Sequence, residues 1–250
     1  MERMYHIGLD ASLGARYAIL PGDPGRVKAI ASRLDGARFV GTNREYESWL
    51  GFLEGEPVLV MSTGMGGPST AIAVEELHRI GLHTLIRVGS CGGMAQQVKG
   101  GDLVVAQASV RMEGTTREYV DVEYPACADW EVTGHLVRAA RATGKAVHIG
   151  VVQSKDSYYG QHEPQRMPAG TELMRRWEQW VAAGCLASEM ESAALFIVSS
   201  VLRMRAGCVL SVFWNQEREK KGLPNPRCQD TSAAIDAAVE AVRAMILDEK

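Results

Sequence analysis

The chain has 250 residues, a formal net charge of -3, 46% hydrophobic residues and 23% charged residues. This length and composition are typical of a globular protein with one large core, or at most two small ones. The slightly negative charge excludes a general basic surface for nucleic acid, but it allows a local cluster of arginines to hold a small anion.

Short apolar runs alternate with helical patterns along the chain. Tyr17 to Leu20 is typical of a buried strand, and the turn after it places Asp23 as the cap of a helix that begins at Pro24. A hairpin is expected over residues 47–62, and the helix after it should close at Gly81. Further strands are expected over Thr84–Val88, Leu103–Val110, Ala146–Val152 and Cys208–Phe213, and helices over Trp130–Thr143, Thr171–Ala183, Met190–Met204 and Thr231–Leu247.

This alternation predicts an α/β layered fold around a mixed sheet. No internal repeat, low-complexity tract or linker interrupts the chain, so we expect one domain over residues 1–250. No apolar run approaches the length of a membrane span, and the amino terminus has no apolar signal region. The cysteine count is odd and no CxxC pair occurs, which indicates free thiols in a reducing cytoplasm. The five cysteines are Cys91, Cys127, Cys185, Cys208 and Cys228.

Three glycine-rich segments follow predicted strands, where α/β proteins commonly bind ligands. They are residues 21–26, 63–67 and 87–93. None has the full GxGxxG spacing or a Gly-Lys-Ser/Thr sequence, so neither a dinucleotide fingerprint nor a P-loop is expected. Their backbone N–H groups instead suit a small anion.

Two arginines accompany these segments. Arg87 lies inside an apolar strand, where a guanidinium is costly to bury without an anionic partner. That partner is either a bound anion or an internal Asp or Glu. Arg26 follows the first turn, where it either faces an anion or is a solvated helix residue. The residues alone leave both alternatives open.

Two carboxylates, Glu189 and Glu191, precede a strongly apolar helix. In the first helical turn they would complement the helix dipole. Alternatively, one of them accepts hydrogen bonds from a sugar diol, which needs a bidentate acceptor. A glycosidase pair must flank the bond that it cleaves, and residues two apart on one short segment do not obviously do so.

Together, four segments resemble the nucleoside phosphorylase-I family: Leu20 to Arg26, Ser62 to Ser69, Arg87 to Gly92 and Glu189 to Ala193. They follow the family order through nearly the whole chain. Within the family, Ser62 to Ser69 followed by Ala73 to Leu77 look most like the uridine phosphorylases. The resemblance implies a three-layer, phosphorylase/hydrolase-like fold with a central mixed, barrel-like β-sheet flanked by helices. It also implies a hexamer, a trimer of dimers, with active sites shared between two subunits.

The resemblance assigns roles to particular residues. Arg87, Glu191 and Gln161 would be catalytic. A structural monovalent cation such as K⁺ would lie at Glu45 and Ser69, as in some relatives. The phosphate site would consist of Gly22, Arg26, Arg87, Gly89 and Ser90, with Arg44 from the neighbouring subunit. The ribose site would consist of Glu189, Met190 and Glu191, with His6 of the neighbour near the 5′ hydroxyl.

The base pocket departs from the family pattern. Tyr158 would pack on the base and Gln161 would pair with uracil. The family usually has an Arg two residues after that Gln, and here either His162 or Arg166 would take its role as a donor to uracil O4. The same family has an Arg at the position of Gln216, for which Arg218 lies close by in sequence.

Asn215 occupies the position where purine-cleaving relatives carry an Asp that protonates the base. Because an Asn cannot supply that proton, this base-site residue favours a pyrimidine.

The activity implied by the resemblance is reversible phosphorolysis of uridine to uracil and ribose 1-phosphate. Inorganic phosphate is the co-substrate, and no organic cofactor, catalytic metal or covalent enzyme intermediate is required. One alternative is a nucleosidase that uses water, which the arginine set disfavours. A second is a purine nucleoside phosphorylase, which Asn215 disfavours. A third is a non-catalytic nucleoside-binding protein of the same fold, which Arg26, Arg87 and Glu191 disfavour.

Overall fold

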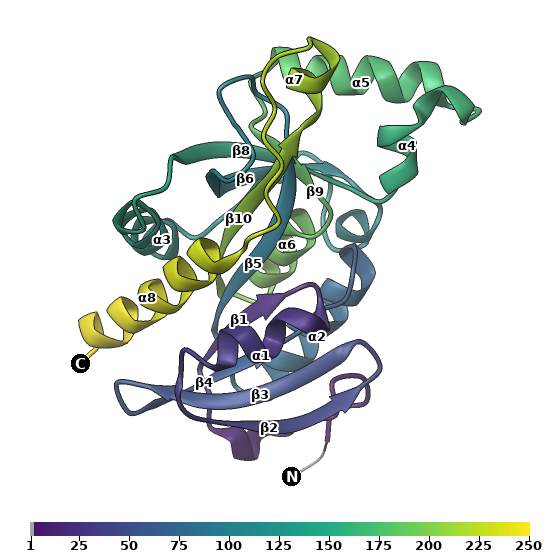
Figure 1. Cartoon of the computed structure of the whole chain (residues 1–250). Helices are drawn as coiled ribbons and strands as arrows, with labels where there is room; N and C mark the ends of the chain where they lie inside the picture. The colour runs from purple at the N-terminus through teal and green to yellow at the C-terminus, as the bar shows by residue number, and fades with distance from the viewer. Residues whose placement is uncertain (1–2) are drawn as a thin grey trace.

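The computed structural model describes residues 3–250 and contains one ten-stranded sheet with helices packed against it (Figure 1). The strands are β1 Tyr17–Pro21, β2 Asp35–Asn43, β3 Tyr46–Leu53, β4 Glu56–Met61, β5 Thr84–Gly93, β6 Leu103–Met112, β7 Ala126–Cys127, β8 Val147–Lys155, β9 Ala187–Glu189 and β10 Arg205–Asn215. The helices are α1 Val27–Ala31, α2 Gly67–Arg79, α3 Trp130–Ala142, α4 Tyr158–His162, α5 Gly170–Ala182, α6 Ser192–Val201, α7 Gln216–Lys220 and α8 Ser232–Asp248.

Five strands close on themselves. The sheet order β10-β6-β8-β9-β5 is completed by a parallel pairing of β5 with β10, which makes a ring. The ring is mixed, because β6 pairs antiparallel with β10 but parallel with β8. From β5 the sheet continues through β1, β4, β3 and β2. The expected α/β class with a mixed, barrel-like sheet is therefore confirmed.

The two faces of the sheet bury two separate cores. Strand β1 shows the division, because side chains alternate between the faces of a strand. Ala18 and Leu20 belong to the core under α2 and α6, whereas Tyr17 and Ile19 belong to the core under α1, α3 and α8. Because both faces are covered, β1 is a continuous apolar run, the pattern expected of a strand buried on both sides.

Local turn chemistry agrees with the sequence in several places. Glu54 and Gly55 both have positive φ, 50° and 83°, as the two central residues of a type I′ hairpin turn require. Gly81, at φ 100°, follows the end of α2 as expected of a helix-terminating glycine. Asp23 accepts a hydrogen bond from the Gly25 N–H and so caps the helical turn that begins at Pro24.

The main differences lie at strand ends. Strand β8 was expected to end at Val152 but continues to Lys155 through three polar residues that are buried. Strands β2, β7 and β9 have no counterpart among the expected elements. The helix expected over Met190–Met204 begins only at Ser192, and β9 ends at Glu189, so of the two alternatives for the carboxylates the first-turn position does not hold, and Glu191 precedes the helix at its N-cap.

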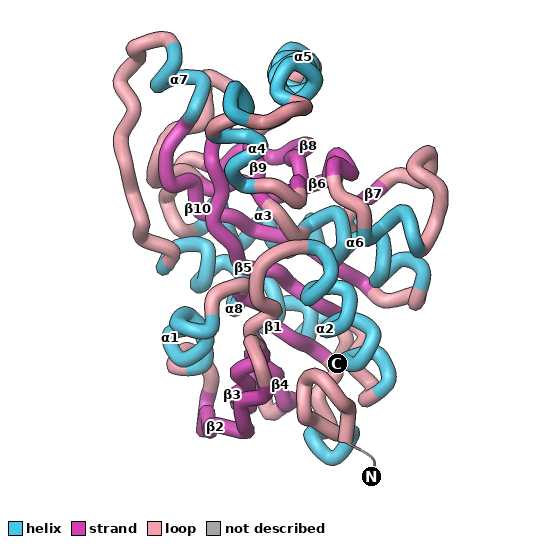
Figure 2. The backbone as a smooth tube through the Cα atoms, turned by 90° about the vertical axis from the view of Figure 1, so that its right-hand side faces the viewer, coloured by secondary structure: helices cyan, strands magenta, loops and turns pink. Residues whose placement is uncertain are grey.

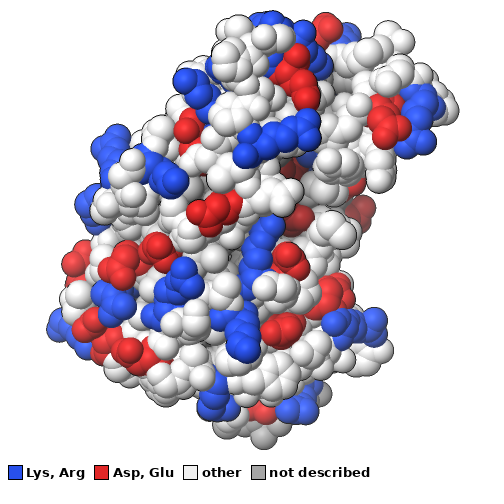
Figure 3. All heavy atoms as spheres, viewed as in Figure 1, with Lys and Arg blue, Asp and Glu red and all other residues white. Residues whose placement is uncertain are grey.

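On the face shown in Figure 3, acidic and basic side chains are interspersed. No continuous basic stripe for a nucleic acid appears on that face. Within residues 3–250, no helix combines the length and the apolar character that a bilayer crossing requires.

Gly207 marks a close contact between β10 and α3. A Cβ at this position would lie 2.5 Å from Val132 Cγ1 and 2.8 Å from Leu136 Cδ1. We predict that Gly207→Ala lowers the free energy of unfolding by about 1–3 kcal/mol, the usual cost of overpacking a core. Urea unfolding measures the change. Gly41→Ala is the matched control, because a Cβ there meets nothing within 4 Å, and equal effects of the two changes would contradict the prediction.

Candidate functional site

A cavity of about 740 Å³ lies where several strands of the sheet end. Its walls come from the turn after β1, the turn after β4, the second half of β5, the β9–α6 junction, α4 and the end of β10. In Figure 2, α4 lies beside β9, with α5 beyond it. Ligand sites of α/β sheets lie at such strand ends.

Most of the residues assigned to the site by resemblance line this cavity. Tyr158 and His162 face it from α4, and their rings lie 4.3 Å apart. Glu45 and Ser69, expected at a monovalent cation, are also in its wall. The remaining predicted residues in the lining are Gly22, Arg26, Arg87, Gly89, Ser90, Gln161, Glu189, Met190 and Glu191.

His6 and Arg44 do not line the chain's own cavity. The Nδ1 atom of His6 lies 2.7 Å from Glu76 Oε1, and the backbone N–H of His6 donates to the same carboxylate. Arg44 is exposed at φ 54°, with its guanidinium 5.7 Å from the ring centre of Tyr5. Residues that serve a neighbouring subunit's site would also lie outside their own cavity.

Asn215 is fully buried and lies outside the lining. Its Nδ2 donates to the carbonyls of Ala95 and Val98, at 2.8 Å each. Its Oδ1 accepts from the Arg218 N–H and so caps α7. Asn215 therefore connects the loop after β5 to the start of α7, and its side chain lies outside the cavity wall.

Two of the three candidate replacements for the family's arginines also point elsewhere. Arg166 pairs with Glu163 at 2.5 Å, and more than half of its side chain is exposed. The Arg218 guanidinium donates to the carbonyls of Pro224 and Gln96. Among the three, His162 alone lines the cavity.

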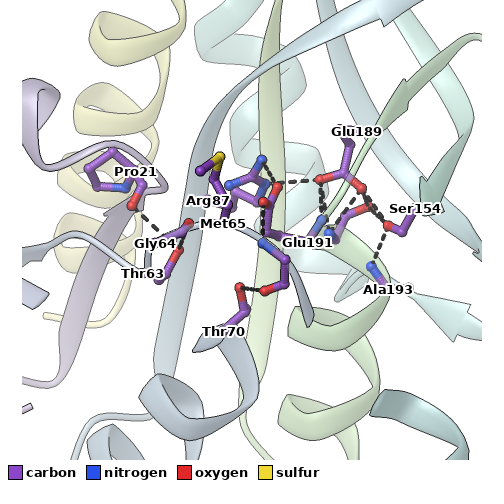
Figure 4. A network of polar contacts seen from close by, with 12 residues as sticks. Pro21, Thr63, Gly64, Met65, Thr70, Arg87, Ser154, Glu189, Glu191 and Ala193 are labelled. Carbon is purple, nitrogen blue, oxygen red and sulfur yellow. Dashed lines mark hydrogen bonds and ion pairs between the residues drawn. The ribbon is translucent and has the colours of Figure 1, made fainter. Parts of the chain in front are cut away.

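Arg87 forms a buried ion triad with the two carboxylates (Figure 4). Its Nε donates to Glu189 at 3.1 Å, and its Nη2 donates to Glu191. Arg87 is only 5% exposed, yet it lines the cavity and its Nη1 has no hydrogen-bond partner within the described residues. Arg87 therefore has the internal carboxylate partners of one alternative, while its Nη1 keeps N–H donors that no described residue uses.

Glu189 accepts more hydrogen bonds than Glu191, the other carboxylate of this triad. It accepts from the Ser192 hydroxyl at 2.6 Å, from the Ser154 hydroxyl, and from the Glu191 N–H at 2.9 Å. Burial alone would raise its pKa, but the charge of Arg87 and the hydroxyl donors hold the pKa of Glu189 below its usual range. Glu189 is therefore a charged carboxylate whose acceptor capacity is used within the protein.

Glu191 has a different environment. The Gly66 N–H donates to its Oε1 at 2.7 Å, where α2 begins. Burial raises the pKa of Glu191, the Glu189 charge adds to this effect, and Arg87 opposes it. Glu191 has fewer internal donors than Glu189, so it keeps lone pairs available on the cavity side for hydroxyl donors.

The structure also brings Lys155 into the site, which the sequence analysis did not single out. It ends β8, is buried and lines the cavity, and its Nζ donates to Ser188 Oγ at 2.8 Å. Burial lowers its pKa to about 8, although Glu189 and Glu191 oppose the shift. In the sequence, the one signal was that Lys155 stands three residues before Tyr158, which was expected to pack on the base.

Aromatic side chains at the end of β10 were likewise missed. The Arg26 guanidinium lies 5.8 Å from the ring centre of Phe213. The ring of Trp214 lies 5.7 Å from that of His162. Burial, with the charge of Lys155, lowers the pKa of His162, so the imidazole is neutral at pH 7 and has one N–H to donate.

A model of the phosphorylase superfamily matches residues 16–247. The chain belongs to this superfamily. It is 51% identical to the uridine phosphorylase of Treponema pallidum, over 98% of the chain and 95% of that protein. It is 39% identical to the uridine phosphorylase of Escherichia coli, over 97% and 98%. It is 34% identical to the guanosine phosphorylase of Halorubrum lacusprofundi, over 98% and 100%.

The two cavity arginines should differ in their contributions to stability. Arg87→Ala would leave Glu189 and Glu191 buried without their counter-charge, so we predict a loss of about 3–5 kcal/mol in the free energy of unfolding. Arg26→Ala removes a 3.9 Å contact with the exposed Asp23 and the contact of the guanidinium with the Phe213 ring, and we expect a loss below about 1 kcal/mol. Denaturant unfolding of both variants is the measurement. Equal losses would show that the triad does not carry this stability.

Proposed function

We propose that the protein catalyses the reversible phosphorolysis of uridine to uracil and ribose 1-phosphate. The observation that carries this proposal is the free Nη1 edge of Arg87, buried in a cavity that also contains Arg26 and Glu191. A phosphate dianion requires fixed positive charge, and arginine supplies it with paired donors. The similarity to uridine phosphorylases over nearly the whole chain supports the same conclusion.

In the proposed reaction, phosphate binds between Arg26 and Arg87, beside Gly22, Gly89 and Ser90. A phosphate oxygen attacks C1′ of the ribose while the bond from C1′ to N1 of uracil breaks. The electron pair of that bond leaves with uracil, which later takes a proton from solvent. The sugar develops positive charge in the transition state, and the bound phosphate stabilises it electrostatically. No group of the protein becomes covalently attached.

Glu191 is proposed to hold the ribose. Its lone pairs on the cavity side suit the 2′ and 3′ hydroxyls, and Met190 lies beside it in the cavity wall. Glu189 acts through Arg87 and Glu191, because its own acceptor sites are occupied. We therefore assign Glu189 a positioning role and reserve contact with the sugar for Glu191.

The base is proposed to lie among Gln161, His162 and Lys155, with Tyr158 and Trp214 as aromatic walls. As the glycosidic bond breaks, negative charge grows on the uracil oxygens, and donors placed there strengthen. Lys155 supplies the positive charge that the family's arginines would otherwise provide. Since Asn215 is directed away from the cavity, the choice of a pyrimidine rests on Gln161 and Lys155 instead.

We also propose that the active enzyme is a hexamer in which His6 and Arg44 complete a neighbour's ribose and phosphate sites. The position of both side chains outside their own cavity supports this arrangement. Glu45 and Ser69 both lie close to Gly64. They are two oxygen-bearing side chains, fewer than a K⁺ ion needs as ligands, so a structural K⁺ there would take its other ligands from a second copy of the chain. Light scattering measures the oligomer, and a monomeric active enzyme would contradict the proposal.

We further propose that residues 1–250 form one catalytic domain that acts in pyrimidine nucleoside salvage in the cytoplasm. All five cysteines are free thiols, as a reducing compartment requires. The described residues contain no group of three or more His, Cys, Asp or Glu side chains that could hold a metal ion. Phosphate is the co-substrate in the proposed reaction, with no organic cofactor.

The decisive assay follows release of free base from uridine, thymidine, inosine and adenosine with and without phosphate. We expect phosphate-dependent release of uracil from uridine. Arg26→Ala should lower this rate about a hundredfold or more, since it removes a fixed charge from the nucleophile's site. Base release without phosphate would indicate a nucleosidase, cleavage of inosine but not uridine would indicate a purine enzyme, and no release from any nucleoside would indicate a binding protein.

The charge of Lys155 predicts a pH profile. With a pKa lowered to about 8, Lys155 is charged below that pH, so kcat/KM for uridine should fall as the pH rises through about 8. Lys155→Arg, which stays charged, should move the alkaline fall to higher pH. Lys155→Met should lose about a hundredfold or more below a pH of about 8, and its difference from the wild type should shrink as the wild-type lysine loses its charge at higher pH. A wild-type alkaline limb that persists unchanged in Lys155→Arg would refute this role.

A further inference from the structure

Ser188 lies at the centre of a polar cluster in the cavity wall. Its Oγ lies 2.7 Å from Gln161 Oε1, 2.6 Å from Gln153 Oε1 and 2.8 Å from Lys155 Nζ. Its position is set by the barrel, because β9 pairs Ser188 with Gln153 of β8 on one side and with Gly92 of β5 on the other. Ser188 is 3% exposed, so solvent does not replace these contacts.

The Lys155 ammonium group determines which atom donates in the hydrogen bond between Lys155 and Ser188. The Lys155 ammonium only donates, so Ser188 Oγ accepts from it. The single hydroxyl proton of Ser188 then points away from that positive charge, toward one at a time of the two neighbouring amide oxygens, those of Gln153 and Gln161. A chain from ammonium to hydroxyl to amide oxygen is polarised in one direction, and each bond in it strengthens the next. In the structure the Gln161 amide presents its oxygen to Ser188.

The other end of the Gln161 amide is also held. Its Nε2 donates to Gln216 Oε1 at 3.1 Å, across from the start of α7. With one contact at each end, Gln161 keeps one lone pair on Oε1 and one N–H on Nε2. These form an acceptor and a donor side by side, in a fixed order along the edge of the amide.

The order of acceptor and donor determines which base is bound. Uracil and thymine present a ring N–H beside a carbonyl oxygen, which complements an amide whose oxygen faces the ring nitrogen. Cytosine has no hydrogen on that ring nitrogen and presents an amino group beside it. It would pair only with an amide turned by 180°, so an amide fixed in one orientation discriminates between these bases.

We propose that Ser188 is a specificity-determining positioning residue. By holding the oxygen of Gln161 on the Lys155 side of the cavity, it selects a base with a ring N–H between two carbonyls over cytosine. Ser188 acts through Gln161, and it is not proposed to touch the reacting atoms. The inference rests on the proposed phosphorolysis of uridine.

The test uses the full-length enzyme and two measurements. One is kcat/KM for uridine, and the other is the ratio of the inhibition constants of cytosine and uracil against uridine phosphorolysis. Ser188→Ala should lower both kcat/KM and the ratio by about tenfold, the usual effect of losing one such hydrogen bond. Ser188→Thr, which keeps the hydroxyl, should restore the ratio. Ser199→Ala is the matched control, because Ser199 Oγ is buried without a hydrogen-bond partner among the described residues.

An unchanged ratio in folded Ser188→Ala would overturn the inference. An equal fall in Ser188→Ala and Ser188→Thr would overturn it as well, since the effect would then follow packing and not the hydroxyl. If Ser188→Ala does not fold, Ser188→Cys decides, because its thiol fills nearly the same space and is only a weak hydrogen-bond donor and acceptor. A lowered ratio then supports the inference and an unchanged ratio overturns it. Failure of the wild-type enzyme to release uracil would instead refute the proposed function itself.

Discussion

The buried contact of one arginine with two carboxylates organises this molecule. Arg87 stands on β5, which belongs to the closed ring, whereas Glu189 and Glu191 lie on either side of the break between β9 and α6. Three charges removed from water are tolerable only because each has charged and hydrogen-bonding partners. Serine hydroxyls and backbone N–H groups supply the remaining donors. The same arrangement that neutralises the carboxylates leaves Nη1 of Arg87, a residue of the cavity wall, without a hydrogen-bond partner among the described residues.

Stability and substrate binding are therefore difficult to separate at Arg87. The charge of an arginine in an apolar strand needs an anionic partner, which is either an internal carboxylate or a bound anion. Here the fork-shaped guanidinium makes the internal ion pairs with two of its nitrogens and, in the proposed function, binds phosphate through the third, since its five donors point in different directions. Arg26 differs, because it lies on the turn after β1 with a single distant carboxylate and the face of Phe213 as neighbours. Because Arg26 makes few contacts within the chain, its substitution should change phosphate binding with less effect on the free energy of unfolding than substitution of Arg87.

The sequence predicted the layered fold well, because hydrophobic period and turn residues are local signals. The hairpin at Glu54–Gly55 and the helix stop at Gly81 are examples. It did not predict β9, a strand of three residues, since its pairing with β5 and β8 depends on segments far apart in the chain. For the same reason Lys155 and Ser188 escaped notice, because their burial and mutual contact exist only once the ring closes. Asn215 was found from the sequence but misplaced in its role. It occupies the family's base-site position, yet its side chain is buried and donates to the Ala95 and Val98 carbonyls.

The chain places its site residues on supports of different kinds. Arg87, Glu189 and Ser188 stand on strands of the closed ring, whereas Tyr158, Gln161 and His162 stand on α4, within the excursion from residue 156 to residue 186 that leaves the ring after β8 and returns at β9. Mutations in that excursion alter contacts at one end of the cavity while the ring keeps its charges in place. In the proposed reaction the base therefore meets two supports, Lys155 and Ser188 of the ring and Gln161 of α4, so a change of base preference would have to keep the excursion and the ring compatible with each other.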